Sequence, residues 1–334
     1  MNAPAQLADG VLNSHGGEQR RHLAKAITLL ESTREDHRAQ ADELLTALLP
    51  HTGRSLRIGL SGVPGVGKST LIECLGLWLI DQGHKVAVLA IDPSSSVSGG
   101  SILGDKTRME YLSVQENAFI RPSPSSGTLG GVAEKTRECM LLCEAAGYDV
   151  IIVETVGVGQ SETTVSGMTD MFVMMQLPNA GDDLQAIKKG VMELADLVLI
   201  NKFDLNVDAA KRAQAFIESA MRLFHSPRHV NEGESLPEWI PNVLTLSALE
   251  GLGVENFWKQ VIEFKKIQKG NGQWVARRHS QSLTWMNERI NTGLKQAFYA
   301  HPDIAQALPR FTKAVSEGRL APSTAARQLL GMWN

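Results

Sequence analysis

The sequence predicts an α/β fold: a doubly wound, mainly parallel sheet covered by helices, with helical arms at both ends of the chain. Short apolar, β-branched runs recur between residues 57 and 247, and helical patterns separate them. Several runs are apolar throughout rather than alternating, as expected when both faces of a sheet are covered. The segments outside this region show helical patterns without strand signals.

The N-terminal part of the chain is expected to form a helical arm. Residues 1–17 are small and polar, so we expect them to be mobile, and residues 18–53 should form the arm. Ser32 and Glu35 have the spacing of a capping box that opens a second helix, which Pro50 ends. The first helix presents three apolar residues on one face: Leu23, Ile27 and Leu30.

The central region, residues 54–270, should contain the sheet. Its predicted strands are 57–61, 86–91, 118–121, 149–154, 171–176, 197–201 and 243–247. Ligands of a doubly wound sheet bind at the carboxyl ends of its strands. Polar residues that directly follow the strands are therefore the candidate site residues.

Strand signals end after about residue 270, so residues 271–334 are expected to form a C-terminal helical arm. Pro302 and Pro309 should break it into shorter pieces. A long helix before them carries an apolar stripe: Leu283, Met286, Ile290, Leu294 and Ala297. Such an arm either packs on its own core or meets a second copy. Because this stripe and the aromatic residues flanking it exceed what one sheet edge needs, we favour an arm that pairs two copies as a homodimer.

Composition excludes several classes of partner and location. Lys+Arg total 33 against 36 Asp+Glu, so the net charge of −3 gives no bulk attraction to nucleic acid or membranes. No apolar run approaches the roughly 20 residues of a membrane span, and the N-terminus lacks a secretion signal. The 3 cysteines are too few for a disulfide framework. We therefore expect a cytoplasmic protein with neither nucleic-acid nor membrane partners.

The residues after the first strand have the pattern of a phosphate-binding loop, or P-loop. Its glycines let several N–H groups turn towards one anion, and the following helix adds its positive end. Lys68 would neutralise β- and γ-phosphate oxygens, and Ser69 would ligate Mg²⁺. A chance glycine-rich turn is the alternative, which the placement between strand and helix disfavours. The predicted nucleotide-binding residues are Gly62, Val63, Pro64, Gly65, Val66, Gly67, Lys68, Ser69 and Thr70.

A second motif predicts which base is bound. Asp204, in Asn201-Lys202-x-Asp204, can accept from N1–H and the exocyclic amine of guanine, whereas adenine has no donor at N1. Asn201 would hold the loop or touch N7, and the Lys202 stem would cover the base. The tetrapeptide alone is a weak signal. The next predicted strand ends in residues whose N–H can meet guanine O6: Ser247, Ala248 and Leu249. Together the motifs predict GTP and GDP over ATP.

Two strand-end carboxylates should complete the magnesium and γ-phosphate site. Glu154 precedes Gly157, whose N–H would meet the γ-phosphate; the carboxylate would order Mg²⁺ directly or through water. Asp92 ends another strand as a second candidate ligand, and the Ser/Gly-rich run after it resembles a switch segment. Asp105 and Arg108 either swing in during hydrolysis or remain helix-surface charges.

The predicted catalytic residues are Lys68, Asp92, Asp105, Glu154 and Gly157. Val158 follows Gly157, at the position where relatives of the Ras type place the water-orienting glutamine. Gln160 lies two positions further on. We therefore expect slow intrinsic GTP hydrolysis that a partner accelerates.

Taken together, these motifs resemble the MeaB/ArgK family of GTPases. The resemblance rests on residues 62–69, 90–96, 154–162 and 201–204, and it spans about residues 20–330. It implies a GTPase of the class that includes signal-recognition and metallochaperone GTPases. It further implies a homodimeric chaperone of methylmalonyl-CoA mutase, which uses GTP to gate the loading of adenosylcobalamin and protects the mutase from inactivation.

Residues 178–196 also resemble the family and would lie near the nucleotide crevice. Asp182, Asp183, Lys188 and Lys189 either carry the nucleotide state to the partner, with Lys188 as the favoured contact, or form a helix start with acids at its positive end.

Three other functions compete with this hypothesis. A metallochaperone GTPase would want a His-rich tract or closely spaced cysteines near the nucleotide, and the sequence shows neither. A P-loop kinase or transport ATPase would not need the guanine motif. A nucleotide-bound scaffold without hydrolysis would not need the magnesium ligands Ser69, Asp92 and Glu154.

Overall fold

The computed structural model describes residues 3–32, 34–91, 109–121, 129–155, 161–178, 189–224 and 237–333. The chain forms two compact units, Met1–Arg277 and Arg278–Asn334. The C-terminal arm is predicted to begin at residue 271, a few residues before the second unit begins. No helix within the described ranges combines the length and apolarity needed to cross a membrane.

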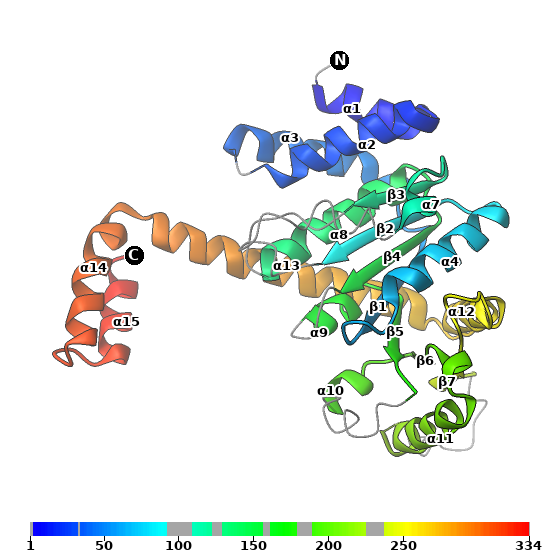
Figure 1. Ribbon diagram of the computed structural model, residues 1–334. Coiled ribbons are helices and arrows are strands. Elements are labelled where there is room, and N and C mark those ends of the chain that lie inside the picture. Colours follow the sequence, from blue (N-terminus) through cyan, green and yellow to red (C-terminus); the bar gives the residue numbers. More distant parts are fainter. Residues whose placement is uncertain are drawn as a thin grey trace. The chain divides into compact units, whose positions relative to one another are not determined.

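The first unit is built on a parallel sheet of the order β3-β2-β4-β1-β5-β6-β7 (Figure 1). Its strands, within the described residues, are β1 Leu56–Gly62, β2 Val86–Ile91, β3 Ala118–Arg121, β4 Val150–Thr155, β5 Met171–Gln176, β6 Leu197–Ile200 and β7 Asn242–Thr245. Each neighbouring pair runs parallel. The prediction of a doubly wound, mainly parallel sheet is confirmed, and each predicted strand lies within two residues of the observed one.

Helices cover both faces of this sheet, because successive strand residues point to opposite sides. One face packs against α4 Lys68–Asp81, α7 Glu110–Ser113 and α12 Val254–Gly270. The other packs against α8 Leu129–Ala145, α9 Ser161–Ser166, α10 Lys189–Met192 and α11 Val207–Phe224. On β4, Val150 and Ile152 belong to the first face, which we call the α4 face, and Ile151 and Val153 to the second, the α8 face.

The N-terminal arm consists of α1 Ala3–Asn13, α2 Gly16–Glu31 and α3 Glu35–Leu48, followed by the short η1 Leu49–His51. Its buried residues belong to the same core as the α8 face. Residues 3–13 lie within the segment expected to be mobile, 1–17, and the structure gives them a helix. This helix, α1, buries Val11, and Gln19 donates to the carbonyl oxygens of Val11 and Ala146 at 2.9 and 3.0 Å. The arm is thus part of the domain core.

The expected capping box is also absent from the described residues. Ser32 is the C-cap of α2, and Arg34 is the N-cap of α3 without a side-chain cap. The Ser32 hydroxyl accepts instead from the Arg34 N–H at 3.3 Å and lies 2.8 Å from His37 Nδ1. The chain therefore turns between the helices through Ser32 rather than continuing from it into a helix.

Arg277, at the end of the first unit, is fastened to the amino ends of two strands. Its guanidinium binds both carboxylate oxygens of Asp196, at 2.9 and 3.0 Å, and also the Asp170 carbonyl. Asp196 Oδ2 additionally accepts from the Phe172 N–H at 2.8 Å. Asp170 and Asp196 directly precede β5 and β6. This network therefore ties together the amino ends of these two strands, whereas the candidate site lies at the carboxyl ends.

The second unit contains α14 Pro302–Ser316, α15 Pro322–Gly331 and most of α13 Gln273–Ala300. Pro302 begins α14 as expected, but Pro309 does not break the chain: α14 continues through it, and Ile304 and Phe311 on either side are both buried. The α13 stripe is about half exposed at Leu283, Met286, Ile290 and Leu294.

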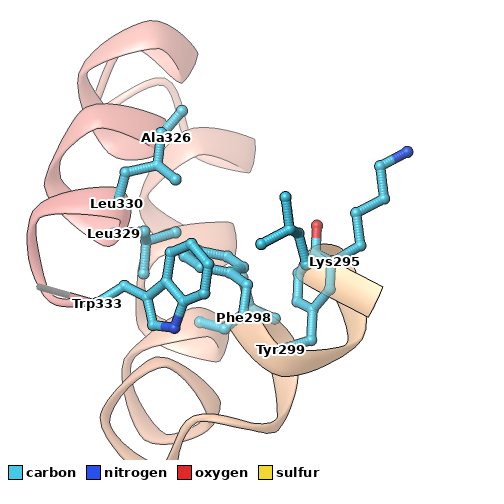
Figure 2. A pocket seen from close by; sticks show the side chains of 9 residues that line it. Lys295, Phe298, Tyr299, Ala326, Leu329, Leu330 and Trp333 are labelled. Atoms are coloured by element: carbon cyan, nitrogen blue, oxygen red, sulfur yellow. The ribbon is translucent and has the colours of Figure 1, made fainter. Parts of the chain in front are cut away.

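A pocket of about 380 Å³ opens among these helices. Figure 2 shows its lining, with the Trp333 indole beside Phe298 and the Lys295 side chain extending away from the rings. The two rings meet edge to face with centroids 5.7 Å apart. Apart from the Lys295 side chain and a few polar atoms, the lining of this pocket is apolar.

Candidate functional site

The predicted P-loop connects the central strand β1 to the first turn of α4. Gly67 has φ of +98°, a left-handed conformation that favours glycine. A Cβ on Gly67 would also lie 2.4 Å from Asn201 Nδ2. Val66 is fully buried, whereas Pro64 and Gly65 are exposed. The loop is therefore anchored at Val66 and open at its tip, and Thr70 lies exposed in the first turn of α4.

Lys68 holds its ammonium group within the curve of this loop. Lys68 is buried, and its Nζ donates to the carbonyl oxygens of Gly62 at 2.7 Å and Val63 at 3.4 Å. These contacts place a positive charge beside the loop's N–H groups. An anion at this position would meet a cation, backbone donors and the positive end of α4 together.

Two of the three predicted magnesium ligands touch each other. Ser69, in the first turn of α4, donates through Oγ to Glu154 Oε1 at 3.4 Å. Glu154 is buried at the end of β4, opposite Leu60 of β1. A hydroxyl and a carboxylate are the hard oxygen donors that Mg²⁺ prefers, so these two residues fit the ion chemically.

The guanine motif is fastened directly to the P-loop. Asn201 is buried; its Nδ2 donates to the Val66 carbonyl at 2.7 Å, and its Oδ1 accepts from the Ala248 N–H at 2.9 Å. Lys202 Nζ donates to the Gly65 carbonyl at 2.9 Å. Asn201 therefore links the P-loop to the loop that follows β7. Three segments distant in sequence thus converge at one rim of the sheet.

The remaining predicted base-recognition residues lie beside this link. Asp204 is exposed in the short η3 Phe203–Leu205. Ser247 pairs with Leu252 through two backbone hydrogen bonds, of 3.0 and 3.1 Å, which close a turn containing the exposed Leu249. Lys202 has φ of +61°, the one left-handed non-glycine residue in the described part of the chain. This backbone bend directs the chain from β6 back towards the P-loop.

Several predicted site residues lie outside the described residues. They are Asp92, Asp105, Arg108, Gly157, Val158, Gln160, Asp182, Asp183 and Lys188.

Two contacts near this rim were not predicted. Thr155 Oγ1 donates to Ser61 Oγ at 3.0 Å, and Glu73 Oε1 accepts from the backbone N–H groups of Tyr111 and Leu112 at 2.8 and 3.2 Å. Both join residues far apart in sequence, and neither belongs to a motif. Only the sheet register and the packing of α7 on α4 bring them together.

Two of the three cysteines lie in the core rather than at the rim. Cys139 and Cys143 are buried in the core on α8. Burial raises the pKa of both thiols. They behave as small apolar residues.

A parallel sheet whose central strand leads into a P-loop, with an Asn-Lys-x-Asp loop bonded to that P-loop, defines the class of P-loop GTPases. The family described as methylmalonyl Co-A mutase-associated GTPase MeaB matches residues 23–303. The chain belongs to this family, and the predicted resemblance is confirmed.

Relatives of known name support the assignment. The chain is 53% identical to a putative GTPase of Caulobacter vibrioides over 98% of both chains. It is 46% identical to GTPase ArgK of Escherichia coli, covering 97% of this chain and 96% of that one. It is also 46% identical to the mouse methylmalonic aciduria type A homolog, covering 93% of this chain and 76% of that protein.

A solved structure agrees with the fold. The crystal structure of an LAO/AO transport system kinase has a TM-score of 0.75 and 40% identity, covering 99% of this chain and 98% of that one. The protein is therefore a GTPase of the MeaB family.

Proposed function

We propose that this protein is a magnesium-dependent GTPase chaperone of methylmalonyl-CoA mutase, which gates loading of adenosylcobalamin and protects the mutase from inactivation. The observation that carries the nucleotide part is the bonding of Asn201 to both the P-loop and Ala248. The mutase part is supported by the family's description and by the name of the mouse relative.

In this proposal each site residue has a separate role. Lys68 neutralises the β- and γ-phosphates, and Asp204 accepts from guanine N1–H and the amine while the Ala248 region meets O6. Ser69 and Glu154 hold Mg²⁺, with Asp92 as a third candidate. The ion, when bound, supplies charge neutralisation between the phosphates. Asp105 and the Gly157 N–H are proposed to act on the γ-phosphate.

GTP selectivity is tested by calorimetry with GTP and ATP, each with Mg²⁺. We expect at least a hundredfold preference for GTP, because adenine would leave the Asp204 carboxylate unpaired. Asp204→Asn should reduce that preference while Asp208→Asn, on the exposed surface of α11, should not. Equal affinity of the wild-type protein for both nucleotides would contradict the proposal.

Partner coupling is tested by hydrolysis assays with and without the purified mutase. We expect slow turnover alone, since Val158 replaces a water-orienting glutamine, and faster turnover with the mutase. Lys188→Ala should abolish stimulation and leave GTP affinity unchanged, with Asp182→Ala as the second test of the same segment. Unchanged stimulation in both variants would remove these residues from the coupling.

We also propose that the protein is a homodimer joined through the second unit. Half-exposed apolar side chains along α13 and the apolar pocket beside α15 support this. Ile290→Glu should convert a dimer to a monomer in light scattering and leave GTP affinity unchanged. Asn291→Glu adds the same charge at the next exposed position as the control. A wild-type monomer at all concentrations would contradict the proposal.

A further inference from the structure

We infer that the hydroxyl pair of Ser61 and Thr155 is a positioning device for the magnesium-site carboxylate Glu154. The inference rests on the proposed magnesium-dependent hydrolysis. Thr155 Oγ1 donates to Ser61 Oγ at 3.0 Å, and Thr155 and Ser61 are 0% and 2% exposed. The pair is thus sealed from water.

The pair lies on the opposite face of the sheet from the magnesium ligands. Leu60 of β1 is opposite Glu154 of β4, so the next residues along both strands are Ser61 and Thr155. Successive side chains point to opposite faces. Since Ile152 faces α4 and Val153 faces α8, Glu154 belongs to the α4 face and Thr155 to the α8 face.

The end of β4 is consequently fastened on both faces. On the α4 face Glu154 accepts from Ser69, and on the α8 face Thr155 donates to Ser61. The Ser69–Glu154 distance of 3.4 Å is at the outer limit of a hydrogen bond, so a small rotation of the strand end would separate the two oxygens. The Thr155–Ser61 bond opposes this rotation.

The same pair also fixes the start of the P-loop. Ser61 directly precedes Gly62, whose carbonyl accepts from Lys68 Nζ at 2.7 Å. This hydrogen bond between two hydroxyl groups therefore fixes the position of the β4 end, which carries Glu154, relative to the P-loop, which leads to Lys68 and Ser69. On this face the neighbours of the pair across the sheet are apolar: Ile91 of β2 beside Thr155 and Met174 of β5 beside Ser61. If either hydroxyl is removed, the other loses this hydrogen bond in a buried site.

Other buried hydroxyl groups offer a matched control. Thr136 is buried on α8, and its Oγ1 donates to the Val132 carbonyl one turn earlier at 2.9 Å. That bond stays within one helix and touches neither strand. Thr136→Val therefore removes a buried hydroxyl of the same kind without affecting the β1–β4 connection.

The test compares Thr155→Val, Ser61→Ala, the double variant, Thr155→Ser and Thr136→Val in GTP hydrolysis by the protein alone across a range of Mg²⁺ concentrations. Loss of outer-shell support weakens metal sites by 10- to 100-fold. We expect the Mg²⁺ concentration for half-maximal rate to rise about tenfold in Thr155→Val, in Ser61→Ala and, no further, in the double variant. GDP affinity in EDTA should change less than about twofold in each variant. Thr155→Ser should retain the wild-type Mg²⁺ concentration for half-maximal rate, and Thr136→Val should leave that concentration unchanged.

Several outcomes would overturn the inference. An unchanged magnesium requirement in both Ser61→Ala and Thr155→Val would show that the pair is only structural, as would an equal shift in Thr136→Val. Ser61→Ala decides the matter if Thr155→Val does not fold. A wild-type rate independent of Mg²⁺ would overturn the magnesium site and this inference together. Failure of the mutase to stimulate the protein affects the chaperone proposal alone, because the mutase is absent from these assays.

Discussion

Replacing Asn201 with alanine should uncouple the P-loop from the guanine-recognition loops. The Asn201 side chain is 2% exposed and makes two hydrogen bonds, from Nδ2 to the Val66 carbonyl and from the Ala248 N–H to Oδ1. Both partners are backbone groups of other loops. Removing the Asn201 side chain therefore removes the link without displacing any neighbouring side chain.

The expected loss follows from these two bonds. A typical intramolecular hydrogen bond contributes about 1 kcal/mol net, whereas a buried partner left unsatisfied costs about 1–3 kcal/mol. Ala248 and Val66 are both buried, so the larger figure applies to at least one of them. We expect Asn201→Ala to lower the free energy of unfolding by about 2–4 kcal/mol. The loops would also be less preorganised, so GDP affinity should fall at least tenfold.

Urea unfolding and calorimetric titration with GDP measure the two effects. Asn201→Asp is the informative companion, because its Oδ1 still accepts from Ala248 while its other oxygen faces the Val66 carbonyl without a proton between them. We expect it to be no more stable than Asn201→Ala. The reasoning is refuted if Asn201→Ala unfolds within about 0.5 kcal/mol of wild type, or if Asn201→Asp is clearly the more stable variant.

Four further predictions concern the core and the first unit's end. Arg277→Met should lower the free energy of unfolding by about 1–3 kcal/mol. This loss is smaller than the loss from breaking a fully buried ion pair, because Arg277 is partly exposed. Adding Asp196→Asn should recover part of the loss, measured by urea unfolding. Additive losses would contradict this. Leu23→Ala, at a fully buried position of α2, should lower it by about 2–5 kcal/mol; a loss below about 1 kcal/mol would show that α2 is only loosely attached. Burial raises the pKa of the Cys139 and Cys143 thiols above their ordinary value of 9.0, so a thiol reagent at neutral pH should modify neither before unfolding. Because these thiols stay protonated to higher pH in the folded state, stability should be unaffected below pH 9.0 and decline above it, in urea unfolding at a series of pH values.

The strands and the P-loop could be predicted from the sequence because their signals are local. Runs such as 86–91 and 171–175 are continuously apolar, and the P-loop glycines stand at fixed offsets from Lys68. The base-recognition motif could likewise be read from residue types at the end of a strand.

The remaining features depend on partners distant in the chain. Helix α1 was not predicted because its only large apolar residues are Leu7, Val11 and Leu12, and Val11 is buried by packing that composition does not show. The motif left two roles open for Asn201, since its acceptor at Val66 is 135 residues away. Ser61 and Thr155 are 94 residues apart, and only the β1–β4 register brings them together.

The position of β1 in the middle of the sheet has a consequence for how the chain folds during synthesis. Its two neighbours are β4 and β5, so the strand that precedes the P-loop has no pairing partner until residue 150 and beyond have left the ribosome. Closing such long loops before any ladder forms slows folding and leaves apolar segments uncovered meanwhile. We expect nascent chains of up to about 150 residues to remain protease-sensitive and to need protection from aggregation.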